Sequence, residues 1–151
     1  MNTTVSDGWK MIDGRIIKFL KRHHVMTIAT SAGNKPWCAS CFYAYMKEDN
    51  LFVLTTEDDT KHGKEFAENP VVAGSVALET MIAGKIRGIQ LQGTVYKPEG
   101  DELGKAKIHY LKRFPVAALM DIHLWVIKPA YIKMTDNKLG FGRKLTWTAE
   151  Q

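Results

Sequence analysis

The stretch Trp37 to Thr56, WCASCFYAYMKEDNLFVLTT, decides the fold class. Its first half, Trp37 to Met46, is dense in aromatic residues, and its second half, Leu51 to Thr56, is apolar and ends in two hydroxyls. A short polar link, Lys47 to Asn50, separates the two halves. Aromatic and β-branched residues favour strands, and two strands joined by a short polar link are most simply an antiparallel hairpin. The stretch therefore predicts antiparallel β structure.

Further strands are expected on both sides of this hairpin. Within Lys85 to Tyr96, Ile89, Leu91 and Val95 alternate with polar residues, which is typical of a strand with one buried face. Ser31 to Pro36 has the composition of a turn. The complete set of additional strands is expected at His24 to Thr30, Val71 to Leu78, Lys85 to Tyr96 and Ile122 to Ile127, the last extended by Tyr131 to Met134.

Helices are expected at three places in the chain. Apolar residues recur at three- and four-residue steps from Trp9 to Arg22, with Asp7 placed to cap the start. A short helix is expected within Glu57 to Asn69. Pro98 opens a longer helix that ends at Arg113, and its expected buried stripe consists of Leu103, Ala106, Tyr110, Leu111 and Phe114.

The order of these elements predicts the fold class. Hairpins with helices at the margins are unlike the strand–helix alternation of a parallel α/β protein. The chain is therefore expected to be mainly β with flanking helices, as a small closed antiparallel barrel of roughly six strands. The tail, Thr135 to Gln151, contains Phe141, Leu145 and Trp147, so it is expected to pack against another part of the protein.

Composition excludes several classes of protein. The chain has 151 residues, of which 45% are apolar and 25% charged, which fits a single globular domain over 1–151. No apolar run approaches the roughly 20 residues that a membrane-spanning helix needs, and no secretory signal is visible. Two cysteines in such a chain indicate reduced thiols and a cytoplasmic location. The net charge of +5 comes from scattered cations, so no nucleic-acid partner is expected.

Cys38 and Cys41 invite a metal or redox interpretation, but strand geometry argues against it. Residues three apart in a strand point to opposite faces, so the two sulfurs can neither bridge nor share a zinc ion. No second ligand pair stands at zinc-site spacing. We expect two buried structural thiols and no metal site.

The segment after the hairpin, Glu57 to Pro70, is the main candidate for chemistry. A strand ends in hydroxyls, crosses a short loop and enters a helix at Thr60. Free N–H groups and the helix dipole make such a start a potential anion site, to which Thr60, Lys61 and His62 would add donors for a phosphate. The alternative is an ordinary capped helix with solvated cations, and the nearby Asp58 and Asp59 oppose an anion.

The order of motifs resembles the flavin-binding split barrels related to pyridoxamine 5′-phosphate oxidase. The resemblance covers nearly the whole chain and rests on Thr55-Thr56, Thr60-Lys61-His62, Asn69-Pro70-Val71 and the strand Arg87 to Gly93. Other stretches are similar to an uncharacterised bacterial branch of that superfamily: Trp37-Cys38-Ala39, Phe42-Tyr43, Arg113 to Ala117, and Thr135 to Gly142. The resemblance implies an antiparallel FMN-binding split barrel.

The resemblance also implies a set of site residues. Lys61 and His62 would hold the FMN phosphate, and Thr55 and Thr56 would line the flavin at the end of the third strand. The second strand would run along the flavin ring at Ala39, Ser40, Cys41 and Phe42. Three positions depart from the oxidases: Ala39 replaces a phosphate-binding arginine, His62 a lysine, and Gly88 a flavin-contacting glutamine.

The function implied is that of an FMN-binding protein, and by extension a flavin-dependent oxidoreductase of unknown substrate, in which FMN carries the redox chemistry. No side chain is an obvious acid or base, so no catalytic residue is assigned. The tail offers Arg143-Lys144-Leu145 in place of the Arg-x-His arrangement of the oxidases, so a true pyridoxamine phosphate oxidase is not expected. The alternative is a module that binds haem or another planar ligand in the same cleft, and a nucleic-acid-binding barrel is the weakest hypothesis.

A homodimer is expected from the resemblance and from the hairpin itself. Trp37, Phe42, Tyr43 and Tyr45 place large apolar groups on both faces of one strand. Because a strand that is buried on one face does not need aromatic residues on the other, one face is expected to meet a second copy.

Overall fold

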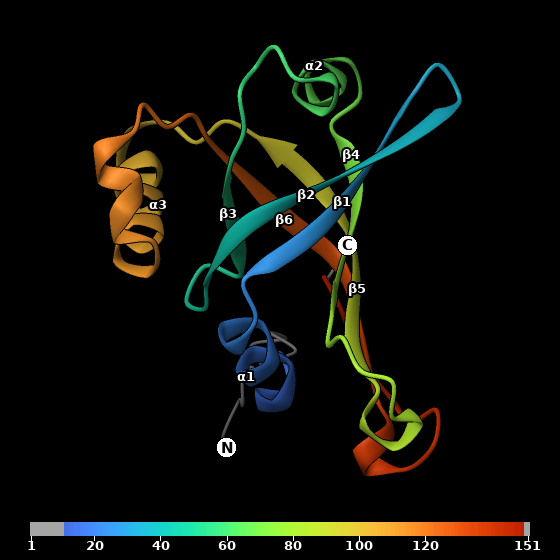
Figure 1. Cartoon of the computed structure of the whole chain (residues 1–151). Coiled ribbons are helices and arrows are strands. Elements are labelled where there is room, and N and C mark those ends of the chain that lie inside the picture. Colours follow the sequence, from blue (N-terminus) through green and yellow to red (C-terminus); the bar gives the residue numbers. More distant parts are fainter. Residues whose placement is uncertain (1–10, 150–151) are drawn as a thin grey trace, which may run out of the picture.

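One antiparallel sheet closes on itself to form the centre of the molecule (Figure 1). The computed structural model describes residues 11–149. Across these residues the strand order is β3-β2-β1-β4-β5-β6-β7, and β3 also pairs with β6. The pairing of β3 with β6 turns six of the strands into a closed ring, so the prediction of an antiparallel barrel with flanking helices is confirmed.

The hairpin that decides the fold is formed as expected. β2 (Lys35–Met46) pairs with β3 (Leu51–Thr55) in antiparallel register, with Tyr43 opposite Leu54. β1 (Val25–Ala32) pairs with the other edge of β2 through a turn at Gly33 and Asn34. Both turn residues have positive φ values, 55° and 60°, which suit a two-residue hairpin turn. The turn is therefore tighter than the Ser31 to Pro36 segment predicted from the sequence.

The remaining strands complete the ring. β4 (Val71–Ala77) pairs with β1 and with β5 (Arg87–Tyr96), and β5 pairs with β6 (Leu124–Asp136). β6 is one continuous strand that joins the two segments expected from the sequence, Ile122 to Ile127 and Tyr131 to Met134. The tail forms a strand, β7 (Lys144–Thr148), which pairs with the second half of β6.

A bulge lets β6 follow β5 along its whole length. The pairing register shifts between Gln92 and Gly93, opposite Pro129 and Tyr131. A Cβ atom on Gly93 would lie only 2.4 Å from the Lys128 carbonyl oxygen, so glycine is required for this close approach.

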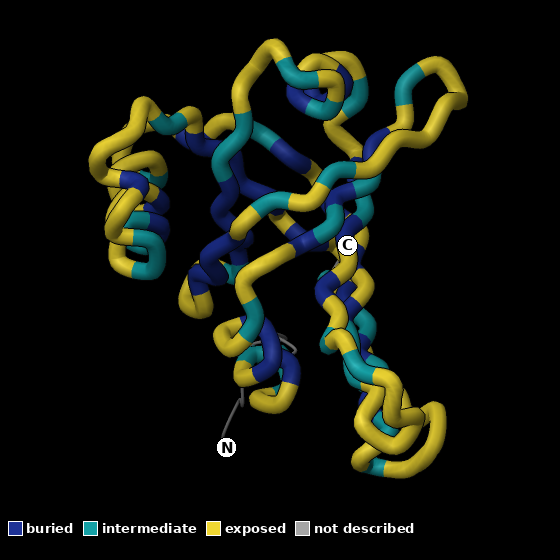
Figure 2. The backbone as a smooth tube through the Cα atoms, in the orientation of Figure 1, coloured by how far each residue is buried: buried dark blue, intermediate teal, exposed yellow. Residues whose placement is uncertain are grey.

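The barrel interior is the larger of two apolar clusters. Figure 2 shows the backbone positions that are buried. Inward residues of β5 belong to it, as the alternation of Ile89, Leu91 and Val95 predicted. The second cluster lies between the barrel and α3 (Gly100–Arg113), where Ala106 and Tyr110 are buried. Leu103 was expected in this stripe, but it is 40% exposed.

The first helix, α1 (Gly14–Arg22), packs against the end of the barrel. It begins later than the predicted Trp9, because the carboxylate of Asp13 caps it by accepting the N–H of Arg15 at 2.9 Å. Trp9 and the predicted cap Asp7 lie outside the described residues. The Tyr43 hydroxyl donates to the Leu20 carbonyl at 2.7 Å, which joins α1 to β2.

Arg113 joins the ends of two helices. Its guanidinium donates to the backbone carbonyls of Lys21, at 2.7 Å, and of His23. The cation therefore lies beside carbonyl groups at the end of α1 that have no partner within that helix. Among the described helices, none is long and apolar enough to cross a membrane.

Candidate functional site

A tight loop carries the chain from β3 into α2 (Lys61–Glu68), the helix at the top of Figure 1. The Thr60 hydroxyl caps the helix by accepting the N–H of Gly63 at 3.0 Å. A Cβ atom on Gly63 would lie 2.4 Å from the Glu57 carbonyl oxygen, so the loop can fold this closely only over a glycine. The helix predicted within Glu57 to Asn69 is thus confirmed, with Thr60 as its N-cap and Lys61 as its first residue.

Three predicted site residues meet at this helix start. The Thr56 hydroxyl lies 2.5 Å from Nε2 of His62 and 3.3 Å from the Thr60 hydroxyl. The His62 ring packs edge-on against Phe66 at 5.7 Å between ring centroids. Burial lowers the pKa of His62 below its ordinary value, so the imidazole is neutral at neutral pH. The cluster can offer hydroxyl and imidazole hydrogen bonds to a ligand.

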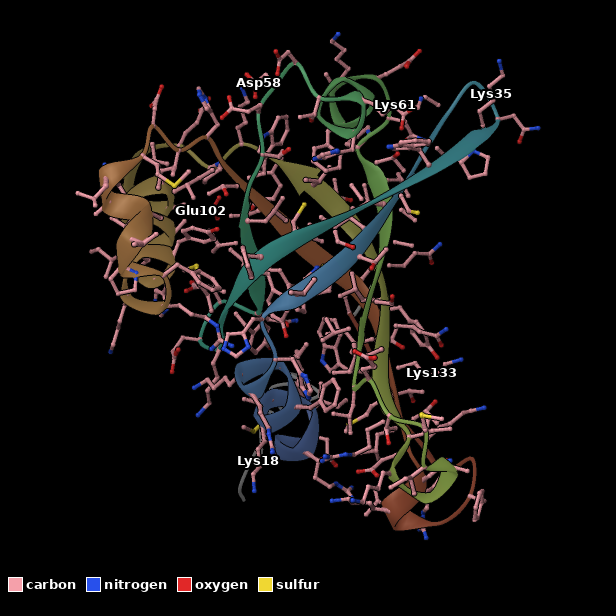
Figure 3. All side chains as sticks on the ribbon, in the orientation of Figure 1. Lys18, Lys35, Asp58, Lys61, Glu102 and Lys133 are labelled. Carbon is pink, nitrogen blue, oxygen red and sulfur yellow. The ribbon has the colours of Figure 1, made fainter. Side chains whose placement is uncertain are left out.

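Lys61 begins α2 and extends toward β1 and β2 (Figure 3). Its side chain is 54% exposed, and Nζ lies 5.3 Å from the centroid of the Trp37 ring. The first turn of α2 contains no acidic side chain. A cation at this end opposes the helix dipole, whereas Asp or Glu would favour it, so the dipole does not stabilise Lys61 at this position.

Glu65 is the residue of this region that the sequence analysis missed. It is 6% exposed, and its carboxylate accepts the Lys61 ammonium at 2.5 Å and the hydroxyl of Thr30 on β1. The Lys61 ammonium and the Thr30 hydroxyl hold the pKa of Glu65 below its ordinary value, so the carboxylate is ionised at neutral pH. The four-residue spacing of Lys61 and Glu65 is the one signal in the sequence that could have indicated this pair.

Two acidic residues of the loop before α2 have side-chain partners. Asp58 lies 2.5 Å from Nζ of Lys97, and that ammonium also lies 5.1 Å from the centroid of the Trp125 ring. Lys97 lowers the pKa of Asp58. Nε2 of His123 lies 3.5 Å from the Glu57 carboxylate. The Lys97 ammonium reduces the repulsion that Asp58, labelled on the loop in Figure 3, would exert on an anion.

The other predicted site residues on β2 and β3 lie along the sheet. Thr55 is half-buried, and its hydroxyl lies 3.2 Å from the hydroxyl of Tyr110 on α3. The Ser40 hydroxyl lies 3.3 Å from that of Thr27. Phe42 is 58% exposed, and its ring centroid lies 5.3 Å from that of Phe114.

The cysteines differ from the prediction of two buried thiols. Both are free, but Cys38 is exposed and Cys41 is half-buried. Burial raises the pKa of the Cys41 thiol. The expectation for Cys38 was wrong because this half of β2 projects away from the barrel core, whereas Tyr43 to Met46 are buried. Within residues 11–149, no cluster of His, Cys, Asp and Glu could hold a metal ion.

Gly88 lies apart from the start of α2. It is the second residue of β5, opposite Ala77 and Thr135, and only Ile86 separates that strand from η1 (Ala83–Lys85). α2 packs instead on β1 and β2 at the other end of the barrel (Figure 1). A single copy of the chain therefore brings Thr56, Thr60 and His62 together but leaves Gly88 remote.

Two surface cavities lie outside this region. One of about 310 Å³ is lined by Lys21, Ala44, Tyr45, Lys47, Glu48, His109, Lys112 and Arg113. The other, of about 320 Å³, lies beside α3 and is lined by Lys107, Leu111, Ala117, Ala118, Met120, Asp121 and Ile122. None of the predicted site residues lines either cavity.

Comparison with known proteins identifies similar sequences. No protein-family model matches the chain. The chain is 40% identical over 132 residues to a UPF0306 protein of Photorhabdus laumondii, a match that covers 87% of this chain and 92% of that protein. It is 41% identical over 133 residues to a UPF0306 protein of Yersinia pseudotuberculosis, covering 88% of this chain and 90% of the relative.

Solved structures share the fold at lower identity. A haem-binding protein from Mycobacterium smegmatis matches with a TM-score of 0.70 and 24% identity, over 83% of this chain and 52% of that chain. A FAD-binding protein from Mesorhizobium loti matches with a TM-score of 0.66 and 15% identity, over 80% of this chain and 89% of that chain. A Listeria innocua protein, named as a candidate pyridoxamine 5′-phosphate oxidase, matches with a TM-score of 0.62 and 14% identity. That match covers 78% of this chain and 93% of the Listeria chain. The fold is that of the split barrels of the pyridoxamine 5′-phosphate oxidase type.

Proposed function

The chain belongs to the UPF0306 family, and from that premise and the arrangement at the start of α2 we propose that it binds FMN as a flavin-dependent oxidoreductase. The observation that carries the proposal is the meeting of Thr56, Thr60 and His62 at the start of α2, the helix of which Lys61 is the first residue. The Thr60 hydroxyl already donates to the Glu57 carbonyl at 2.8 Å, so the groups left for a phosphate are the Thr56 hydroxyl, the His62 imidazole and the Lys61 ammonium.

The donor set fits the phosphate of FMN better than it fits a purely structural role. Lys61 opposes the dipole of α2 and is half-exposed, so its position is unfavourable for the helix but open to a ligand. Thr60 and His62 are bonded to each other and to Thr56 by contacts of 2.5–3.4 Å. Lys61 and His62 would hold the phosphate, and Thr55 and Thr56 would lie nearest the flavin.

We propose that a second copy of the chain completes the site. Gly88, expected to lie beside the flavin, is at the other end of the barrel from α2. The outward residues Val25 and Phe42 are neighbours across β1 and β2, and they are 48% and 58% exposed. Of the aromatic residues that suggested a dimer, Tyr43 and Tyr45 instead face the core. The exposed pair provides an apolar surface that a homodimer would bury.

FMN would supply the redox chemistry when bound, and the chain would bind and orient it. We assign no acid–base residue. Pyridoxine 5′-phosphate should not be a good substrate, because no histidine follows Arg143 at the spacing found in the oxidases. Both cysteines are unpaired, which suits the reducing cytoplasm in which we place the protein.

A second candidate ligand is haem, because a haem-binding protein from Mycobacterium smegmatis has the same fold. An absorbance spectrum taken during titration with FMN, and separately with haem, distinguishes the two. Quenched flavin fluorescence and perturbed flavin bands on addition of FMN would support the proposal. A strong Soret band with haem and no response to FMN would replace it with the haem-binding alternative. Sedimentation of a monomer at micromolar concentration would contradict the homodimer.

A further inference from the structure

Glu65 is a buried acid that the proposed function does not use. Burial of a charged side chain is unusual unless the charge is paired. Here the carboxylate is bonded to Lys61 on its own helix and to Thr30 on β1, and Thr30 is itself only 2% exposed. The network therefore fixes the carboxylate beside the ammonium group that the proposed phosphate site depends on.

Helix stability does not account for this pair. Lysine precedes glutamate by four residues, which is the less favourable order along a helix. Lys61 also lies at the positive end of the helix dipole. A buried ion pair is weak evidence for stabilisation, because removing two charges from water offsets their attraction. The arrangement instead directly affects the charge available to a ligand at Lys61.

We propose that Glu65 is the internal counter-ion of Lys61 and weakens phosphate binding, so that bound FMN dissociates more readily. This inference rests on the proposed function. A phosphate next to Lys61 shares the ammonium group with Glu65 and is repelled by the carboxylate. Lysine has three N–H donors and can contact both anions, so the carboxylate lowers the affinity without blocking the site. Glu65 is thus a positioning residue that sets how readily the cofactor leaves.

The other charges around the helix start do not cancel this effect. Lys97, the cation of the preceding loop contact, is already paired with Asp58 at 2.5 Å. His62 adds no full charge at neutral pH, because burial lowers its pKa. Lys64 is exposed on α2 and, among the described residues, forms no ion pair with Lys61, Glu65 or Thr30. Removal of the Glu65 charge should therefore be felt by the phosphate with little compensation.

The experiment measures FMN and riboflavin affinity in two variants of the full chain. Glu65→Gln keeps the shape and a hydrogen-bonding group, whereas Glu65→Met keeps only the volume. Both variants should bind FMN on the order of tenfold more tightly, because each removes a negative charge that repels the phosphate. A neighbouring like charge commonly shifts the pKa of an ionisable group by about one unit, which corresponds to a tenfold change in affinity. Riboflavin lacks the phosphate, so its affinity should not change. Glu68→Gln removes an exposed charge from the end of the same helix and serves as the matched control.

The outcomes separate this inference from the function on which it rests. If the unmodified protein binds neither FMN nor riboflavin, the proposed function fails, and the inference fails with it. If the protein binds both but the Glu65 variants bind FMN no more tightly, only the inference is overturned. An equal gain for riboflavin, or an equal gain in Glu68→Gln, also overturns it. Loss of the native circular dichroism spectrum in both Glu65 variants would assign Glu65 a structural role and overturn it as well.

Discussion

Replacement of Lys61 by alanine tests the phosphate site most directly. The side chain is 54% exposed, and one of its three ammonium protons is directed to Glu65. A hydrogen bond between charged groups contributes about 1.5–3 kcal/mol, and solvent screening together with the shared carboxylate favours the lower end. At about 1.4 kcal/mol per tenfold change, Lys61→Ala should weaken FMN binding about tenfold.

Fluorescence titration with FMN and with riboflavin measures this effect. Riboflavin affinity should be unchanged in Lys61→Ala, because riboflavin has no phosphate to lose the contact. Lys64→Ala removes an exposed lysine from the same helix and should leave both affinities unchanged. If FMN and riboflavin weaken equally, the phosphate lies elsewhere and the reasoning from the start of α2 is refuted.

Gly93→Ala should lower the free energy of unfolding by about 1–3 kcal/mol, because the new Cβ would lie 2.4 Å from the Lys128 carbonyl oxygen. Denaturant unfolding measures this change. An unchanged midpoint would contradict the conclusion that the close contact of β5 and β6 requires glycine. Burial lowers the pKa of His62 below 6.5, so the unfolded chain gains a proton first as the pH falls. The contribution of neutral His62 to the free energy of unfolding is fully present above pH 6.5 and is lost as the pH falls below that value. The unfolding free energy of the unmodified protein should thus fall more than that of His62→Gln between pH 7 and pH 5, and parallel curves would refute this. A thiol reagent followed by mass spectrometry should label exposed Cys38 before Cys41, whose pKa burial raises, and the reverse order would contradict the described exposures.

Local sequence patterns predicted most of the barrel. Strand alternation in β5 and the polar link between β2 and β3 are signals within a few residues, and both are confirmed. The start of α1 was predicted too early, because periodicity continues before Asp13, whereas the helix begins where that carboxylate caps Arg15. β7 was missed as a strand because its five residues gain their hydrogen bonds from β6, a distant partner that its own pattern does not reveal.

The candidate site shows the same division between local and distant contacts. Thr56, Thr60 and His62 lie within seven positions of one another, so the turn and the helix start were enough to group them. Glu65 meets Thr30 across 35 positions, a contact that only the barrel topology creates. The position of Gly88 could not be predicted either, because it depends on the order of strands around the ring.

The place of β7 in the sheet affects how the molecule opens. The closed ring depends on the pairing of β3 with β6, whereas β7 is hydrogen-bonded in the described sheet to β6 alone. Detachment of β7 would break its pairing with Tyr131 to Thr135 of β6 but leave the ring of six strands intact. Amides of β7 should therefore exchange with solvent through a local opening of lower free energy than global unfolding, as a separate cooperative unit. We therefore expect the barrel to stay folded while this strand detaches and returns.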